Sequence, residues 1–516
     1  MNAVRTGFDI LENSDSYNRK NEKNTKEGFS EMEKLKILMV SAEVEPFAKT
    51  GGLADVAGAL PMALTAMGHD VRIVMPRYQC ISTKMSYLAD FSVEMLGREE
   101  TAIIREGSLN FDDSGEHYSI PVYFVDNYHY FDRPGIYCYG DDADRFTFFD
   151  KAVLKMLPKI GFKPDVIHCN DWQTGPIPLY LKDFYNNDAY YKEMGTLYTI
   201  HNLQYQGNFG KGVLPVLGLG EEYYTSDKLE FYGEVNFMKS GVLYADLINT
   251  VSETYVKEIK TPEYGERMNG LLNMREKDLY GIVNGIDTVL YNPAEDHKIY
   301  KKYDYKTLHN KAINKRELQM ELGLPTKNCP IISMVTRICD QKGFELVEKI
   351  LPDLLATDVQ FIVLGLGDPH YENLFKEYAK KFPEKFSANI EFNDALAHKI
   401  YAGSDIFLMP SKFEPCGLGQ LIAFRYGTVP VVRETGGLAD TVKDFKIEQE
   451  EGNGFSFKEY SERALMKTLI RAISVYKNMP DLWEDIVVRG MKEDFSWKNV
   501  SDKYVKLYKK VIDKVF

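Results

Sequence analysis

Long apolar runs are absent from this 516-residue sequence, and none reaches the roughly 18 residues that cross a bilayer. Residues 1-33 are rich in Asn, Lys, Glu and Ser and lack the apolar core of a signal peptide, so we expect a disordered N-terminal tail. Basic residues are outnumbered, with 63 Lys and Arg against 76 Asp and Glu and a net charge of −13. This balance argues against nucleic acid and against an anionic membrane as partners.

Cysteine is also scarce and shows no pattern. The six cysteines are Cys80, Cys138, Cys169, Cys329, Cys339 and Cys416. They form no CxxC pair and do not cluster with histidine, so we expect free thiols, no bound metal and a cytoplasmic location. The motifs HExxH and GxSxG, the phosphate-binding P-loop and a metal-binding DxD pair are missing too, which makes protease, esterase and NTPase functions unattractive.

The sequence does have the composition and the alternating strand and helix pattern of a large α/β protein. The chain is 44% hydrophobic and 27% charged, as in ordinary globular proteins, and is long enough for two domains. Strand-like apolar runs alternate with helical patterns from residue 34. After a Tyr- and Lys-rich stretch at 300-305, a second series of alternating strand-like and helical segments begins. We therefore predict two Rossmann-like, doubly wound domains, over 34-280 and 281-495, and a C-terminal helix at 496-516 that packs back on the first domain.

One six-letter string, TGGLAD, occurs twice, at 50-55 and at 435-440. Each copy follows an apolar, β-branched run and opens a predicted helix, which is where open α/β sheets bind ligands. Two glycines let the backbone pass close to a ligand, and the N-terminus of a helix favours phosphate. The alternative is tight strand-to-helix packing without a ligand. Because both copies occupy equivalent places, we favour two turns that point into one cleft between the domains.

Charged residues after predicted strands of the second half suggest a phosphate site. Arg337 and Lys342 can neutralise a diphosphate, although loop charges are more often simply solvated. Gly365 follows another strand and allows close backbone approach. In PSKFEPCGLGQL, Glu414 can accept hydrogen bonds from sugar hydroxyls or cap a helix. Cys416 is expected to be a small buried residue, although a place at a helix start could lower its thiol pKa and allow inactivation by alkylation.

Polar residues also gather after two predicted strands of the first half. His168, Asn170, Asp171 and Trp172 lie in HCNDWQTG, and His201 and Asn202 lie in YTIHNLQYQG. A single histidine is more often structural than functional. Polar groups that converge at strand ends nevertheless favour a site over a core.

Taken together, these strings resemble the bacterial glycogen synthase and plant starch synthase family. The matching strings are KTGGLADV, HCNDWQTG, TIHNLQYQG, NGID, TRICDQKG, GLGDP, PSKFEPCGL, RETGGLADTV and FSW, and they span the chain from about Leu35 to Phe516. The resemblance implies a GT-B fold, with an acceptor-side and a nucleotide-sugar-side domain facing across a cleft. It also implies transfer of glucose from ADP-glucose to the non-reducing end of an α-1,4-glucan such as glycogen, with retention of configuration and without a cofactor or metal.

The resemblance further implies roles for individual residues. The catalytic set is His201, Arg337, Lys342 and Glu414. The substrate-binding set is Lys49, Gly51, Gly52, Asp55, Asp171, Asn202, Asn284, Gly365, Phe392, Cys416, Gly417, Thr435, Gly436 and Gly437. In this interpretation Arg337 and Lys342 hold the donor phosphates, Glu414 binds glucose hydroxyls, and the backbone at 435-437 cradles phosphate. Lys49, Gly51 and Gly52 close over the donor from the other domain, His201 meets the transferred glucose, and Asp171 steers the acceptor.

Some positions depart from the family pattern or leave alternatives open. Gly419 stands where many relatives have Thr, and Phe392 stands where relatives often have a Tyr near the adenine. Either Tyr137 or Tyr139 is the aromatic residue on the acceptor side. UDP-glucose or another acceptor, a non-catalytic glucan-binding role, and double displacement instead of front-side attack remain alternatives. We expect the domains to close about a hinge at 280-293 and after Trp497.

Overall fold

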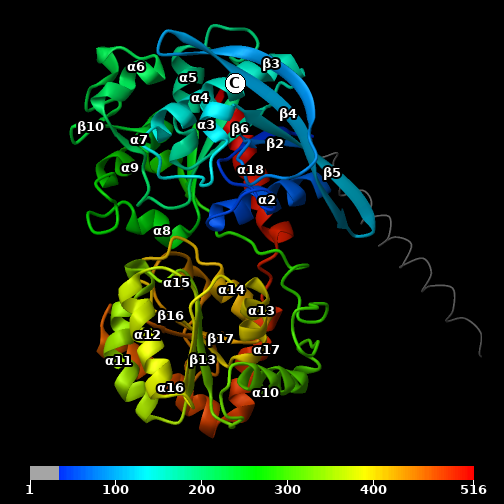
Figure 1. Cartoon of the computed structure of the whole chain (residues 1–516), viewed down its shortest axis with the longest axis vertical. Helices are drawn as coiled ribbons and strands as arrows, with labels where there is room; N and C mark the ends of the chain where they lie inside the picture. Colours follow the sequence, from blue (N-terminus) through cyan, green and yellow to red (C-terminus); the bar gives the residue numbers. More distant parts are fainter. Residues whose placement is uncertain (1–33, 516) are drawn as a thin grey trace, which may run out of the picture.

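The computed structural model describes residues 34–515, and the predicted tail at 1-33 lies outside them. The chain forms two α/β domains placed one above the other along the long axis of the molecule (Figure 1). The predicted α/β class with parallel sheets is confirmed.

The N-terminal domain is built on a nine-stranded sheet. Its strands, in spatial order, are β12 (Leu279–Gly281), β11 (Leu247–Thr250), β7 (Gly195–Ile200), β6 (Val166–Asn170), β1 (Lys36–Val40), β2 (Asp70–Pro76), β5 (Glu116–Asp126), β4 (Arg98–Asp113) and β3 (Ser86–Met95). The strands from β12 to β5 are parallel, whereas β4 and β3 pair antiparallel to their neighbours. Every residue of β6 and β7 is buried, because helices cover both faces of a parallel sheet.

Helices and a small second sheet complete this domain. The helices are α2 (Gly52–Ala66), α3 (Tyr128–Phe131), α4 (Asp142–Ile160), α5 (Pro176–Asp183), α6 (Leu214–Leu217), α7 (Phe237–Tyr244), α8 (Glu253–Glu258) and α9 (Asn269–Met274). The small sheet contains β8 (Asn208–Gly210), β10 (Glu234–Asn236) and β9 (Glu230–Phe231).

The C-terminal domain has a six-stranded sheet that is parallel throughout. Its order is β15 (Phe386–Asn389), β14 (Gln360–Leu364), β13 (Ile331–Val335), β16 (Ile406–Met409), β17 (Val429–Arg433) and β18 (Phe455–Phe457). Its helices are α10 (Lys311–Glu321), α11 (Phe344–Ala356), α12 (Pro369–Lys381), α13 (Asp394–Gly403), α14 (Gly419–Arg425), α15 (Gly436–Thr441), α16 (Glu462–Asn478) and α17 (Pro480–Lys492). None of the helices in the described part of the chain is long and apolar enough to cross a membrane.

The chain passes between the domains twice, and the two crossings lie side by side. The Ile286 amide donates to the Phe495 carbonyl at 2.9 Å. After the second crossing, α18 (Trp497–Val515) returns to the N-terminal domain (Figure 1). Its Trp497, Tyr504 and Tyr508 belong to the apolar core of that domain.

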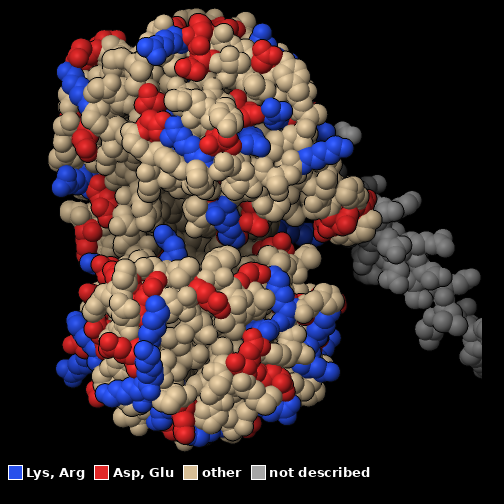
Figure 2. Space-filling view, viewed as in Figure 1, with Lys and Arg blue, Asp and Glu red and all other residues tan. Residues whose placement is uncertain are grey.

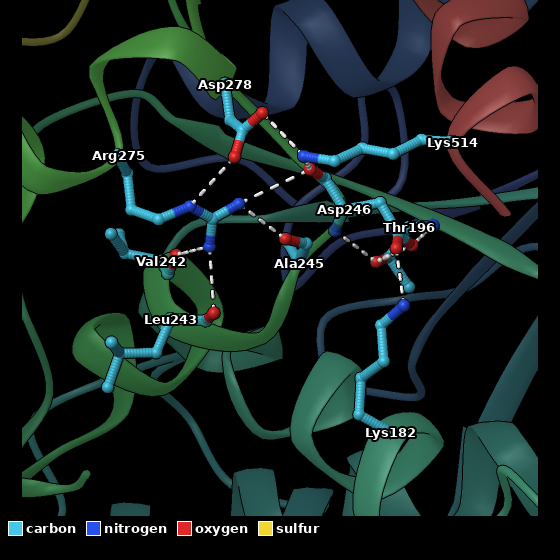
Figure 3. A network of polar contacts seen from close by, with 9 residues as sticks. All are labelled: Lys182, Thr196, Val242, Leu243, Ala245, Asp246, Arg275, Asp278 and Lys514. Carbon is cyan, nitrogen blue, oxygen red and sulfur yellow. Dashed lines mark hydrogen bonds and ion pairs between the residues drawn. The ribbon is translucent and has the colours of Figure 1, made fainter. Parts of the chain in front are cut away.

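A polar network at the far end of α18 fastens it to the same domain (Figure 3). Lys514 donates to the Asp246 carbonyl at 2.9 Å and to the Asp278 carboxylate at 2.5 Å. Arg275 pairs with Asp278 and donates to carbonyls at the end of α7, at 2.6 Å for Val242. The final helix is thus held both by its apolar face and by these contacts.

Candidate active site

The first TGGLAD copy turns its glycines toward open space at the domain boundary. A Cβ on Gly51 would meet no atom within 4 Å, and one on Gly52 would meet only Leu418 of the C-terminal domain, at 3.7 Å. The turn is held from behind by the buried carboxylate of Glu43, which accepts from the Thr50 hydroxyl at 2.7 Å and from the Gly51 amide at 3.2 Å. The Gly51–Gly52 turn therefore faces the opposite domain with its backbone uncovered.

The second copy has a different role from the one expected. A Cβ on Gly436 would lie 2.0 Å from the Glu414 carbonyl, and one on Gly437 would lie 2.1 Å from the Cys416 carbonyl. The Gly437 amide donates to the Glu414 carbonyl at 3.2 Å, and the Gly436 amide donates to the Glu258 carboxylate at 3.1 Å. These amides are already paired with the protein, so Thr435, Gly436 and Gly437 support the loop that carries Glu414 and do not offer a free phosphate cradle.

A buried ion pair joins Glu414, in the loop at 411-418, to Lys342, which lies just before α11. Lys342 donates to the Glu414 carboxylate at 2.6 Å, with only 15% and 7% of the two side chains exposed. The Ser411 hydroxyl donates to the same carboxylate oxygen at 3.0 Å. A lysine and a carboxylate held together at the end of a parallel sheet can bind a phosphate and a sugar hydroxyl side by side.

Arg337 lies in the loop after β13 and is exposed. Its side chain forms no hydrogen bond or ion pair with any residue that the structure describes, so its guanidinium is available to an anionic ligand. The backbone at Gly365 lies close to another loop of the protein and not to open space, because a Cβ there would lie 1.9 Å from the Thr336 carbonyl. Gly365 thus allows its loop to brace the loop that carries Arg337.

The surroundings of Cys416 do not favour the lowered thiol pKa that its place in the sequence suggested. The residue is buried, as predicted, and burial raises the pKa of its thiol to about 12, although a backbone hydrogen bond from Asn284 opposes the shift. Because the thiolate is the reactive form, this shift argues against ready alkylation of Cys416. The adjacent Gly417 has φ +74°, a conformation that favours glycine in this turn.

His201 and Asp171 form one unit at the carboxyl ends of β6 and β7. The Asp171 carboxylate accepts from the His201 amide at 2.7 Å, and the His201 ring donates through Nε2 to the Asn170 side-chain oxygen at 2.9 Å. Asp171 is held at φ +57°, a strained backbone conformation for a residue with a side chain. Such strain at a cleft is typical of a pre-organised site.

Burial shifts the pKa values of this unit. Desolvation raises the pKa of Asp171 from 3.8 to about 7, although the amides of His201 and Asn202 oppose the shift. Desolvation also lowers the pKa of His201 to about 3. His201 is therefore neutral at physiological pH, whereas Asp171 titrates within that range.

The structure separates several residues that the sequence grouped together. His168 is fully buried and contacts the Tyr508 hydroxyl at 2.9 Å and the Thr199 hydroxyl at 2.6 Å, which makes it a structural residue under α18. Tyr137 donates to Glu43 at 2.7 Å and so lies at the first TGGLAD turn. Tyr139 lies instead against Arg145, whose guanidinium carbon is 4.8 Å from the ring centroid.

The other predicted residues lie around the same boundary. Lys49 pairs with Asp55 at 2.6 Å, beside the exposed turn. Asn284 is buried near Cys416, and its side-chain oxygen has no partner among the described residues. Phe392 is 88% exposed, which leaves its ring free to stack on a ligand.

Figure 2 shows that the surface is hollowed between the two domains, with Lys or Arg side chains beside the hollow. Within residues 34–515, no three His, Cys, Asp or Glu side chains gather closely enough to hold a metal ion. The arrangement suits a ligand that carries a phosphate end and a sugar end, held by both domains.

Two family models and many curated proteins match this chain. Residues 36–274 match the model of the starch synthase catalytic domain, and residues 315–484 match that of glycosyl transferases group 1. The glycogen synthase of Desulforudis audaxviator is 51% identical over 487 residues, which cover 93% of this chain and 97% of that protein. The glycogen synthase of Moorella thermoacetica is 52% identical over 480 residues, with 93% and 97% covered. The chain belongs to the glycogen synthase and starch synthase family.

Solved structures place this family member among the GT-B glycosyltransferases. The catalytic domain of starch synthase IV from Arabidopsis thaliana, bound to ADP and acarbose, aligns with a TM-score of 0.86 and 34% identity over 93% of this chain and 100% of that chain. A sucrose-phosphate synthase from Thermosynechococcus elongatus shares the fold alone, with a TM-score of 0.58 and 16% identity. The family and the GT-B fold predicted from the sequence are thereby confirmed.

Two carboxylates of this glycosyltransferase were missed by the sequence motifs. Glu43 organises the first TGGLAD turn, and Glu258 reaches the second turn from the other domain. Glu43 follows strand β1 in SAEVEPFAKTGG, so its place at a strand end was a usable signal. Glu258 lies at the end of a helix with no local signal, and only the packing of the domains reveals it.

Proposed function

We propose that this protein is a glycogen synthase that transfers glucose from ADP-glucose to the non-reducing end of an α-1,4-glucan with retention at C1. The observation that carries the proposal is the buried Lys342–Glu414 pair, in a loop region that meets the uncovered Gly52 turn across the domain boundary. The related starch synthase IV structure contains ADP and acarbose. Six free thiols support a cytoplasmic location for the reaction.

In the proposed reaction, the bond between C1 of glucose and the phosphate oxygen breaks and a C1–O4 bond to the acceptor forms. Arg337 and Lys342 stabilise the negative charge that develops on the leaving diphosphate. Glu414 accepts hydrogen bonds from glucose hydroxyls, and Lys49 with the Gly51–Gly52 turn covers the donor from the other domain. The acceptor hydroxyl passes its proton to the leaving phosphate oxygen in a front-side attack, and ADP departs.

On the acceptor side, neutral His201 donates or accepts a hydrogen bond without adding charge near the developing oxocarbenium ion. Ionised Asp171 accepts a hydrogen bond from the incoming glucan and orients it. Asn202 and Asn284 line the same cleft, and Phe392 stacks on the adenine. This division assigns the donor phosphates to the C-terminal domain and the glucan to the N-terminal domain.

The test measures glucose incorporation into glycogen by the purified protein, with ADP-glucose and UDP-glucose compared at equal concentrations. We expect ADP-glucose to be preferred, activity to persist in EDTA, and NMR of the product to show the α-anomer. Preference for UDP-glucose would overturn the donor assignment, and a β-linked product would overturn retention. Loss of activity in EDTA with rescue by Mg²⁺ would overturn the metal-free mechanism.

A further inference from the structure

The two domains are joined by a reciprocal contact between two short helices, α8 and α15, which face each other across the boundary (Figure 1). Asp440, at the end of α15, accepts from the Ser252 hydroxyl at 2.7 Å and from the Thr254 amide and hydroxyl at 3.1 and 2.5 Å. Ser252 and Thr254 lie at the start of α8, so a carboxylate of one domain binds the first turn of a helix in the other.

The opposite ends of the same helices are joined in the same way. Glu258, at the end of α8, accepts from the Thr435 hydroxyl at 2.9 Å and from the Gly436 amide at 3.1 Å. Thr435 and Gly436 start α15. The two helices are therefore antiparallel, and each one supplies the carboxylate that caps the other. Carboxylates in such contacts form charge-assisted hydrogen bonds, which are about twice as strong as neutral ones.

The two TGGLAD copies differ in the domain that supplies their partners. In the first copy, the Thr50–Gly51 turn also binds a carboxylate, but Glu43 belongs to the same domain. Asp55, the equivalent of Asp440, pairs with Lys49 of its own loop. The repeated motif thus receives a carboxylate at its Thr-Gly end in both copies, and only the second copy uses both ends to hold the other domain.

Both sides of this contact lead directly to the proposed active site. On the C-terminal side, Gly436 packs on the Glu414 carbonyl, so α15 lies behind the loop of Glu414. On the N-terminal side, the Tyr255 hydroxyl of α8 accepts from the Leu203 amide at 3.3 Å, two residues after His201. A chain of direct contacts therefore links the Glu414 loop to the His201 loop through α15 and α8.

We infer that Glu258 and Asp440 are positioning residues that fix the donor loop of one domain against the His201 loop of the other. Neither Glu258 nor Asp440 contacts the proposed reacting groups of these two loops. Both residues act through the paired helices α8 and α15. Because glucosyl transfer requires reacting atoms about 3–3.5 Å apart, a small shift of one domain relative to the other lowers turnover strongly. The inference rests on the proposed function for the identity of the donor.

The test compares Glu258→Gln, Asp440→Asn and the double variant with the wild-type protein. Glu253→Gln is the matched control, since it removes the same charge from an exposed residue of the same helix. We expect the double variant to lower kcat about tenfold or more with ADP-glucose and glycogen, while the Kd for ADP changes less than about twofold. Glu253→Gln retains wild-type kcat.

Small-angle scattering supplies a readout that does not depend on the donor. Without ligand, the double variant should have a larger radius of gyration than the wild-type and control proteins, and circular dichroism should show the same secondary structure. Thr254→Ser, which keeps the hydroxyl, should behave as wild type, whereas Thr254→Val should resemble Asp440→Asn. Wild-type kcat in the folded double variant, or a loss of ADP affinity equal to the loss of kcat, would overturn the positioning role. An inactive wild-type protein with ADP-glucose would instead refute the proposed function and leave the scattering comparison valid.

Discussion

Arg337 and Lys342 carry the same charge but differ in their surroundings, which separates a catalytic effect from a structural one. Arg337 is exposed without a partner among the described residues, whereas Lys342 neutralises the buried Glu414. We expect Arg337→Ala to lower kcat/KM about 100-fold without changing the melting temperature. Lys342→Ala should lower both activity and stability, because it leaves a buried carboxylate unpaired at a cost of about 3–5 kcal/mol.

These variants are checked by steady-state kinetics with ADP-glucose and by thermal denaturation of the same samples. Lys342→Arg, which keeps the positive charge, is the control for stability. Full activity of Arg337→Ala would contradict its assignment to the donor phosphates.

Asp171 makes the activity depend on pH near neutrality. Its pKa is raised to about 7 by burial, while that of His201 is lowered to about 3, so Asp171 is the group of this pair that ionises between pH 6 and 8. If the ionised carboxylate orients the glucan, kcat/KM for glycogen should rise with pH through about 7. Asp171→Asn should be slow at every pH and should lack this rise, as a pH series of initial rates would show. An unchanged rise in Asp171→Asn would assign the ionisation to another group.

The same shift has a consequence for stability. Since the pKa of Asp171 is raised in the folded state, its contribution to stability is fully present below pH 3.8 and is lost as pH increases to about 7. A shift of this size corresponds to at most about 4 kcal/mol, and access of cleft water reduces it to about 1–3 kcal/mol. Urea unfolding should therefore show Asp171→Asn gaining stability relative to wild type between pH 4 and pH 7, and no further gain above it.

At the scale of elements, α18 is attached to the sheet of the N-terminal domain through the buried His168. The His168 ring donates to Thr199 and accepts from Tyr508, so all of its polar atoms are paired. We expect Tyr508→Phe to cost about 1–3 kcal/mol, because it leaves a buried ring nitrogen without a partner. Tyr504→Phe removes a longer contact of 3.4 Å to Asn249 and should cost less. Equal unfolding midpoints for the two variants in guanidinium chloride would contradict this account.

At the scale of the whole molecule, the two crossings between the domains lie side by side at Ile286 and Phe495, and we expect the hinge there. The donor must contact both domains, and the ends of a glucan must enter and leave, so we expect ADP with a maltooligosaccharide to change the relation of the domains. Gly52→Val places a side chain against Leu418 of the opposite domain. It should retain ADP binding to the C-terminal domain and abolish transfer.

Calorimetry with ADP and scattering with and without ligand provide the measurements. The radius of gyration of the wild-type protein should fall on ligand binding while α8 and α15 stay paired, and that of Gly52→Val should fall less. A Gly52→Val protein that elongates glycogen at the wild-type rate would refute the assignment of the Gly51–Gly52 turn to the donor.

The sequence by itself determined the features that depend on local pattern. Alternating strand and helix signals predicted the α/β class, and the family motifs identified the family, because both are carried by contiguous residues. Polar residues at strand ends predicted His201 and Asp171 as neighbours, since the carboxyl ends of parallel strands meet at one edge of a sheet. The antiparallel strands β3 and β4 were not predicted, because their alternation is weak beside the buried parallel strands.

Only the tertiary structure decided which role each of the two identical TGGLAD motifs has. The glycines of the first TGGLAD copy face open space, whereas those of the second pack against the carbonyls of Glu414 and Cys416. Sequence places both motifs between a strand and a helix, but the partner of each turn comes from a distant segment. Glu43 reaches the first turn from its own domain and Glu258 reaches the second from the other, because burial and partner choice depend on which surfaces the fold brings together.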